Sequence, residues 1–266
     1  MSAPVPVEGF ATSSFTHDGK ERVVYRRGSG PGVVVMHEIP GITPEVARFA
    51  TRVADAGFTA VMPELFGTTG KPMTKAYAAA ELARACISRE FRVLAARASS
   101  PMTDWLRALC REVHAELGFR GVGAIGMCIT GNFALALMVE PSMMAPVLSQ
   151  PSLPGPFGAA RRAGLHLSDG DLAIAKTRTQ RDGVRVLGLR FTGDPSCPAE
   201  RFERLRKEFG DAFEGIEIDS SKGNPHGLPR TAHSVVTMEL VEKTGHPTQL
   251  ALDRVLSFFR EQLGAA

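Results

Sequence analysis

Short apolar runs alternate with amphipathic stretches along almost the whole chain, and this alternation constrains the fold more than any other feature. Runs such as Gly32–Met36 and Val122–Ile125 are apolar throughout, which is typical of strands covered on both faces. Between such runs, stretches such as Pro44–Ala56 and Pro101–Leu117 carry apolar residues at helical spacing. Strands that alternate with helices predict an α/β fold with a mostly parallel sheet and helices on both of its faces.

Local signals predict where these elements begin and end. Thr43 and Ser100 each precede a proline, a pattern that predicts an N-cap followed by the first helical residue, and Gly57 ends the first helix. The other expected strands are 22–26, 58–62, 145–148, 184–191 and 215–218, and the other expected helices are 74–94, 130–139, 198–209 and 248–263.

The 266 residues contain no internal repeat and no linker, so we expect a single domain over 1–266. One stretch differs from the rest. Residues 149–170 are rich in Pro, Gly and Ser, which predicts a long functional loop, or a small lid, inserted into that domain.

Composition narrows the function classes. The 31 Lys and Arg against 28 Asp and Glu leave a net charge of +3 with no basic block, which argues against a nucleic-acid partner. The cysteines show no Cys-x-x-Cys pair and no zinc-ligand spacing, so they predict reduced thiols and no metal; they are Cys86, Cys110, Cys128 and Cys197. The N-terminal residues do not resemble a secretory signal, and the longest apolar run, about 16 residues, is short for a membrane span. We therefore expect a cytoplasmic protein without a membrane partner.

Nucleotide cofactors are not indicated either. The glycine-rich Gly28–Gly32 precedes a strand, whereas a dinucleotide-binding fingerprint follows one, and no P-loop pattern occurs. We expect chemistry without a cofactor, performed by a monomer or a homodimer.

The segment around Cys128 has the pattern of a nucleophile elbow. Cys128 stands between Gly126 and Gly131, where an apolar strand gives way to a helix of small residues. Glycines at these positions suit a sharp turn in which a larger side chain would meet a neighbouring strand or helix. The usual elbow has its second glycine two residues after the nucleophile, a position that Thr130 occupies here. A buried structural cysteine is the alternative interpretation.

An acid and a histidine follow Cys128 in the chain order of the α/β-hydrolase triad. Asp194 comes just after an expected strand, and His226 lies in a turn-rich loop after the last one. Asp194 is otherwise a turn residue that caps the next helix. His233 is the alternative histidine, and we favour His226 because His233 begins a helix-like stretch.

Backbone N–H groups are expected to form an oxyanion hole. Ile129 follows the nucleophile, and Ile39 lies in the loop after an early strand, so these two residues are the candidates. Glu38 would then lie near the thiol and either accept its proton or hold the cysteine neutral. A solvent-facing carboxylate is the alternative for Glu38.

Taken together, these segments resemble the dienelactone hydrolase family of α/β-hydrolases over roughly residues 20 to 264. The segments that carry the resemblance are His37-Glu38-Ile39-Pro40-Gly41, Gly126-Met127-Cys128-Ile129-Thr130-Gly131, Thr192-Gly193-Asp194 and Pro225-His226-Gly227. The resemblance implies an α/β-hydrolase fold and a cysteine nucleophile, Cys128, with Asp194 and His226 as partners. It further implies activation by Glu38 and small enol-lactone substrates that bear a carboxylate.

The resemblance also implies arginines that pair with a substrate carboxylate. Arg230 is one candidate, and Arg89 is our choice over Arg84 and Arg92 for a second one before the elbow. The family usually has an aromatic residue where this chain has Pro40, and the 149–170 insert has no clear counterpart. These departures affect the pocket walls and therefore the choice of substrate.

The sequence thus predicts a cysteine-dependent hydrolase of small lactones or esters. Two other functions stay open: a noncatalytic ligand or redox sensor that uses Cys128, and an acyltransferase with the same triad. A sensor has no need of the acid and the histidine, which favours the enzyme.

Overall fold

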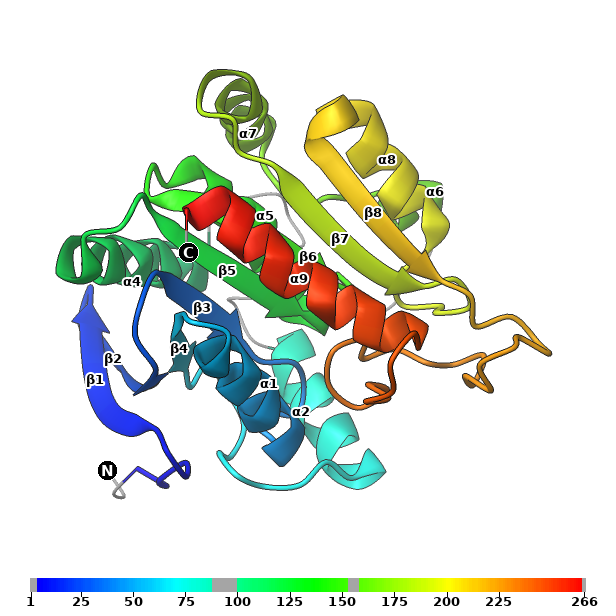
Figure 1. The fold of residues 1–266 in the computed structure, drawn as a ribbon, viewed down its shortest axis with the longest axis horizontal. Helices are drawn as coiled ribbons and strands as arrows, with labels where there is room; N and C mark the ends of the chain where they lie inside the picture. The colour runs from blue at the N-terminus through cyan, green and yellow to red at the C-terminus, as the bar shows by residue number, and fades with distance from the viewer. Residues whose placement is uncertain (1–3, 88–99, 153–157, 265–266) are drawn as a thin grey trace.

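The sheet of the protein has eight strands, and six of them form its parallel part (Figure 1). The computed structural model describes residues 4–87, 100–152 and 158–264. The strand order is β1-β2-β4-β3-β5-β6-β7-β8; β1 and β2 pair antiparallel with their neighbours, and the pairs from β4 to β8 are parallel. The strands are β1 Ala11–His17, β2 Lys20–Arg27, β3 Gly32–Met36, β4 Thr59–Pro63, β5 Val122–Met127, β6 Met143–Ser149, β7 Val186–Phe191 and β8 Phe213–Ile218.

Helices cover both faces of this sheet, as the alternating pattern predicts (Figure 1). In the view of Figure 1, α1 and α9 lie in front of the sheet and α4 and α5 lie behind it. Every residue of β3 to β7 is buried, which explains their continuous apolar sequences. The helices are α1 Pro44–Asp55, α2 Lys75–Ile87, α4 Pro101–Leu117, α5 Gly131–Ala136, α6 Ala159–Arg162, α7 Asp169–Arg181, α8 Ala199–Phe209 and α9 Pro247–Leu263. The predicted α/β-hydrolase fold is confirmed.

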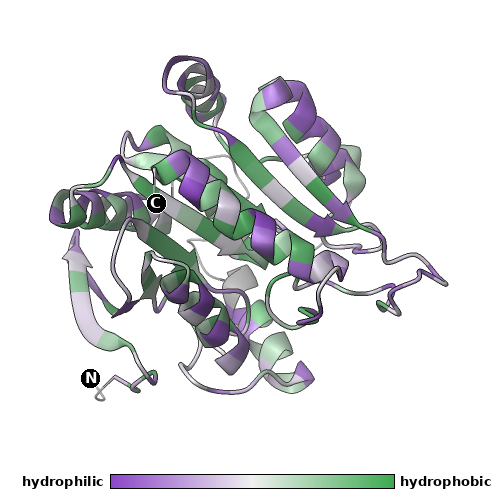
Figure 2. Ribbon diagram, viewed as in Figure 1, coloured by the Kyte–Doolittle hydropathy of each residue, from purple (hydrophilic) through white to green (hydrophobic). Residues whose placement is uncertain are grey.

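The helix caps form as the local sequence predicts. The Thr43 hydroxyl accepts a hydrogen bond from the Val46 N–H at 3.4 Å, and the Ser100 hydroxyl accepts one from the Thr103 N–H at 3.1 Å. Hydrophobic residues follow the strands and the inner helix faces, and hydrophilic residues face outward (Figure 2). Within the described ranges, no helix has both the length and the apolarity that a bilayer crossing requires.

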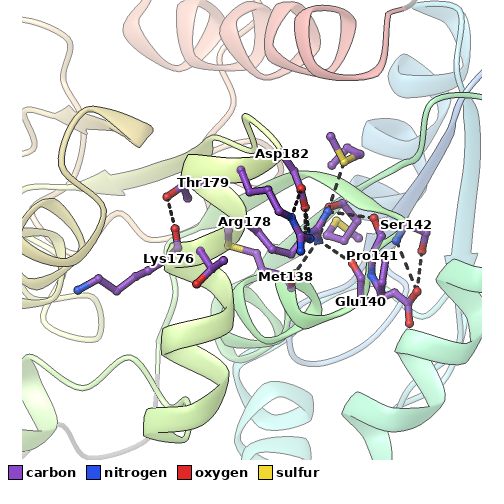
Figure 3. Close-up of polar contacts among 12 residues, drawn as sticks. Met138, Glu140, Pro141, Ser142, Lys176, Arg178, Thr179 and Asp182 are labelled. Atoms are coloured by element: carbon purple, nitrogen blue, oxygen red, sulfur yellow. Dashed lines mark hydrogen bonds and ion pairs between the residues drawn. The ribbon is translucent and has the colours of Figure 1, made fainter.

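The sequence stretch expected to form a loop or lid ends in a helix that the periodicity does not reveal. Residues 149–170 include the short α6 and the first residues of α7, and 153–157 lie outside the described residues. Arg178 of α7 is buried and donates to the carbonyl oxygens of Met138, Glu140, Pro141 and Met143, as Figure 3 shows for the turn that leads into β6. One guanidinium therefore holds the chain that connects α5 to the next strand.

Candidate active site

Cys128 lies at the sharp turn between the end of β5 and the helices that follow it. Its backbone φ is 57°, in the left-handed region that residues with a side chain rarely adopt. A short 3₁₀ helix, η1 (Cys128–Thr130), runs directly into α5. Strained turns of this kind lift a nucleophile above the sheet, and Cys128 is accordingly only partly buried, unlike the fully buried Cys110 and Cys197.

The glycines on both sides of Cys128 are required by close packing. A Cβ on Gly126 would lie 2.1 Å from the Thr130 carbonyl oxygen, and one on Gly131 would lie 2.9 Å from the Pro151 Cα. Thr130, which stands at the usual second glycine position, uses its hydroxyl to accept from the Met127 N–H and to donate to the Met36 carbonyl, both at 2.9 Å. The turn is thereby fixed against the end of β3.

Asp194 and His233 meet beside this turn. Asp194 follows β7, whose carboxyl end lies at the same sheet edge as that of β5, and its side chain is 2% exposed. Its Oδ2 lies 2.7 Å from His233 Nδ1, and its Oδ1 accepts a hydrogen bond from the Ser196 N–H at 2.8 Å. A carboxylate held at both oxygens fixes the orientation of the imidazole and leaves Nε2 of His233 for Cys128.

The surroundings of His233 favour its protonated form. Burial acts to lower the pKa of His233, but the charge of the Cys128 sulfur and the hydrogen bonds with Asp194 and Cys128 outweigh burial and raise that pKa well above 6.5. The three side chains therefore interact as one electrostatic unit, with a cation between two groups that can carry negative charge.

His226, the histidine favoured from the sequence, does not lie in this cluster. It is exposed in a turn fixed by Asn224, and its ring faces that of His246 with 5.4 Å between the ring centroids. Of the two histidines considered from the sequence, the structure brings His233, and not the favoured His226, into contact with Asp194. The sequence suggested that a helix begins at 231–235, whereas 232–234 have no regular secondary structure and a turn spans 235–239.

A buried carboxylate holds the segment that carries His233. Glu38 Oε2 accepts from the Ser234 hydroxyl at 2.6 Å and from the Gln150 side chain at 3.2 Å, and Glu38 Oε1 accepts from the Thr237 hydroxyl. The hydroxyl residues that follow His233 are the sequence signal that could have singled it out. Glu38 shares a cavity with Cys128, as expected, but its side-chain hydrogen bonds go to this segment and to Gln150 instead of to the thiol.

Gly193 brings the chain before His233 close to Asp194. A Cβ on Gly193 would lie 2.6 Å from the Arg230 carbonyl oxygen and 2.9 Å from the Ser220 hydroxyl. The Thr192-Gly193-Asp194 motif therefore places the acid and also allows the chain that carries the histidine to pack against it.

The two expected oxyanion donors line the same cavity as Cys128. Ile129 is buried, and Ile39 is half-buried in the loop after β3. Within the described ranges, the backbone N–H groups of Ile39 and Ile129 have no acceptor. Unpaired N–H groups beside a nucleophile are the kind of donor that stabilises an oxyanion.

The arginines expected to bind a substrate carboxylate are not found in this cavity. Arg230 is exposed and does not belong to its lining, and Arg84 forms an ion pair with Glu81 on α2. Arg89 and Arg92 lie outside the described residues. Among the described residues, the cavity of about 590 Å³ above Cys128 has no Lys or Arg in its lining. No cluster of metal-ligating side chains occurs in the same part of the chain.

A mostly parallel sheet covered by helices, with a strained turn at Cys128 after β5 and an acidic residue after β7, is the arrangement of the α/β-hydrolases. The sequence matches the model of the dienelactone hydrolase family over residues 21–263. The chain belongs to the dienelactone hydrolase family and is a carboxylic ester hydrolase. A search of curated proteins found no match.

Solved structures with the same fold cover nearly the whole chain. A candidate dienelactone hydrolase from Klebsiella pneumoniae is 20% identical with a TM-score of 0.62, covering 95% of this chain and 98% of its own. A dienelactone hydrolase-like promiscuous phosphotriesterase from metagenomic libraries is 18% identical with a TM-score of 0.60, covering 96% and 98%. An α/β serine hydrolase without a lid from Xanthomonas campestris is 11% identical with a TM-score of 0.58, covering 99% and 100%. At these identities the likeness concerns the fold.

Proposed function

We propose that the protein hydrolyses small esters or lactones with Cys128 as nucleophile, His233 as general base and Asp194 as the group that orients His233. The observation that carries the proposal is the contact series Asp194–His233–Cys128, in which His233 Nδ1 lies 2.7 Å from the Asp194 carboxylate. A nucleophile, a base and a third group that orients the base are the parts that acyl transfer requires.

The chemistry proceeds through a thioester. With its proton already held by His233, the Cys128 sulfur attacks the carbonyl carbon, and the resulting oxyanion accepts hydrogen bonds from the Ile39 and Ile129 N–H groups. Each such donor is worth about 2.7–4 kcal/mol in the transition state. The tetrahedral intermediate expels the alcohol, which takes the proton from His233. Water then attacks the thioester, with His233 again accepting the proton, and the acid and the free thiol are released.

Glu38 acts in this proposal as a positioning residue. Its bonds to Ser234 and Thr237 hold the residues that follow His233, so the carboxylate fixes where the imidazole lies. This role differs from the direct activation of the thiol that the family resemblance implies.

The two histidines give a matched test. We expect His233→Asn to lower kcat/KM for p-nitrophenyl butyrate by about 10²–10⁴-fold, the usual range for a lost general base. His226→Asn serves as the control and should stay within about twofold of the wild type, because His226 is exposed and faces His246. Equal effects of the two changes would contradict the proposal.

The same assay separates the enzyme from the two other functions. Stable oxidation of Cys128 to a sulfenate without any ester turnover would favour a sensor. Release of p-nitrophenol only when an alcohol or amine acceptor is added, with the acyl group recovered on that acceptor, would favour an acyltransferase. Steady release of acid into water supports the hydrolase.

A further inference from the structure

Three exposed apolar side chains line the cavity above Cys128. Met73, which precedes α2, Leu82 on α2 and Met238 in the segment after His233 all line it. These three side chains are 38%, 41% and 41% exposed, although they are large and hydrophobic. An exposed apolar cluster at the mouth of a cavity is typical of a surface that binds an apolar ligand.

Apart from His233, the charged groups of the same cavity are acidic. Besides Glu38, the half-buried Glu239 belongs to the lining, and its Oε2 accepts a hydrogen bond from the Ser234 N–H at 2.7 Å. Burial and the charge of Glu38 raise the pKa of Glu239, as expected for two carboxyl groups that share a site. Over the described part of the chain, no lysine or arginine joins the lining to offset them.

His233 is the one cation that the described lining can supply, and its charge is already matched. Asp194 bonds to its Nδ1, and the Cys128 sulfur faces it from the other side. A substrate carboxylate that entered the cavity would therefore meet Glu38 and Glu239 without a compensating positive group from the described lining.

We propose that this cavity selects esters with an apolar, uncharged acyl chain, and that Glu239 is the specificity-determining residue that disfavours a carboxylate-bearing substrate. The inference rests on the proposed function of Cys128. It departs from the carboxylate-bearing lactones that the family resemblance implies, because Glu239 occupies the cavity and Arg230 does not line it.

Two aryl esters of the same acyl skeleton test the inference. One is mono-p-nitrophenyl adipate, which ends in a carboxylate, and the other is its methyl ester, which has the same chain without the charge. At pH 8 we expect the wild type to show kcat/KM at least about tenfold higher for the methyl ester. Glu239→Gln should lower this ratio several-fold because it should raise kcat/KM for the anionic ester. Glu203→Gln, which removes an exposed carboxylate on α8, should leave the ratio unchanged.

Added salt gives a second measurement that needs no variant. In the wild type, 0.5 M NaCl should narrow the ratio because screening weakens repulsion between charges. Equal or faster hydrolysis of the anionic ester by the wild type would overturn the inference, as would a ratio that neither Glu239→Gln nor salt alters. If Cys128→Ala hydrolysed both esters at the wild-type rate, the proposed function would fail instead, and if neither ester were hydrolysed by the wild type, both proposals would fail.

Discussion

The two ends of the helical segment that follows β5 are built in opposite ways. At its beginning, Cys128 adopts a positive φ, and the N–H groups of Ile129 and of Ile39, in the loop after β3, have no acceptor within the described ranges. At its far end, after the 3₁₀ helix η2 (Leu137–Val139), Arg178 donates to four carbonyl oxygens and also pairs with Asp182. One end leaves backbone groups unpaired in a strained turn, and the other pairs them with a buried guanidinium.

This difference separates what serves chemistry from what serves stability. Backbone groups at helix ends need partners, and a protein gains stability by supplying them, as Arg178 does. At Cys128 the protein keeps a strained φ and leaves donors free for a substrate oxyanion, which lowers stability at that position. We expect changes at the Cys128 end to affect turnover first and changes at the Arg178 end to affect unfolding first.

The largest loss of activity is expected from changes at Cys128, in the strained turn. Cys128→Ala should lower kcat/KM for p-nitrophenyl butyrate by at least about 10³-fold, because no other thiol faces His233 among the described residues. Cys128→Gly should be equally inactive but more stable than Cys128→Ala by about 1 kcal/mol, because glycine adopts a φ of 57° without strain. Urea denaturation of the two variants measures this difference. An alanine variant as stable as the glycine variant would mean that the turn stores no strain.

A change at Arg178 should instead lower stability and leave turnover unchanged. Arg178→Met removes the donor for several buried carbonyls and should lower the free energy of unfolding by about 3–5 kcal/mol, with kcat/KM unchanged well below the melting temperature. Arg181→Met is the control, because Arg181 is exposed and its guanidinium bonds to the side chain of Asp182. A large loss of kcat/KM in folded Arg178→Met would contradict the separation of the two ends.

The same contrast explains what the sequence could and could not predict. Neighbours close in sequence determine the caps at Thr43 and Ser100, the bounds of β3 and the need for glycine at position 126, and their prediction is confirmed. Arg178 bonds to carbonyls 35 to 40 residues away, which no local pattern reveals.

The choice between His226 and His233 could not be made from local sequence for the same reason. The segment that follows His233 is held by the bonds of Ser234 and Thr237 to Glu38, nearly 200 residues earlier in the chain. The local cue, a turn-like sequence around His226, indicated the loop correctly but not the residue that reaches Asp194. Long-range contacts decided both the structural arginine and the histidine of the site.

The charge of His233 should make the free energy of unfolding depend on pH. Because the pKa of His233 is raised in the folded protein, protonation of His233 favours folding, and this stabilisation is full below about pH 6.5. It is lost as the pH rises through the higher folded pKa, at about 1.4 kcal/mol for each unit of pKa difference. Cys128→Ala removes the charge of the sulfur and should lower that pKa. NMR titration of the His233 ring in both proteins measures the change, and identical titration midpoints would show that the sulfur does not interact with the ring.

The smallest effect on turnover is expected from a change at Thr237, whose hydroxyl bonds to the Glu38 carboxylate that holds the segment after His233. Thr237→Val keeps the shape of the side chain but removes its hydrogen bond to Glu38, and we expect kcat to fall about fivefold with KM unchanged. Thr177→Val, which alters an exposed hydroxyl on α7, is the control. A change confined to KM would place Thr237 in substrate binding rather than in the positioning of His233.

The central claim is that Cys128 carries the acyl group during turnover. Mixing the enzyme with p-nitrophenyl butyrate, quenching in acid within milliseconds and mapping the peptides by mass spectrometry would measure this directly. The account predicts a burst of p-nitrophenol together with a butyryl group on the peptide that contains Cys128, and no such adduct in Cys128→Ala. Steady hydrolysis with no acylated Cys128, or with the acyl group on another residue, would contradict it.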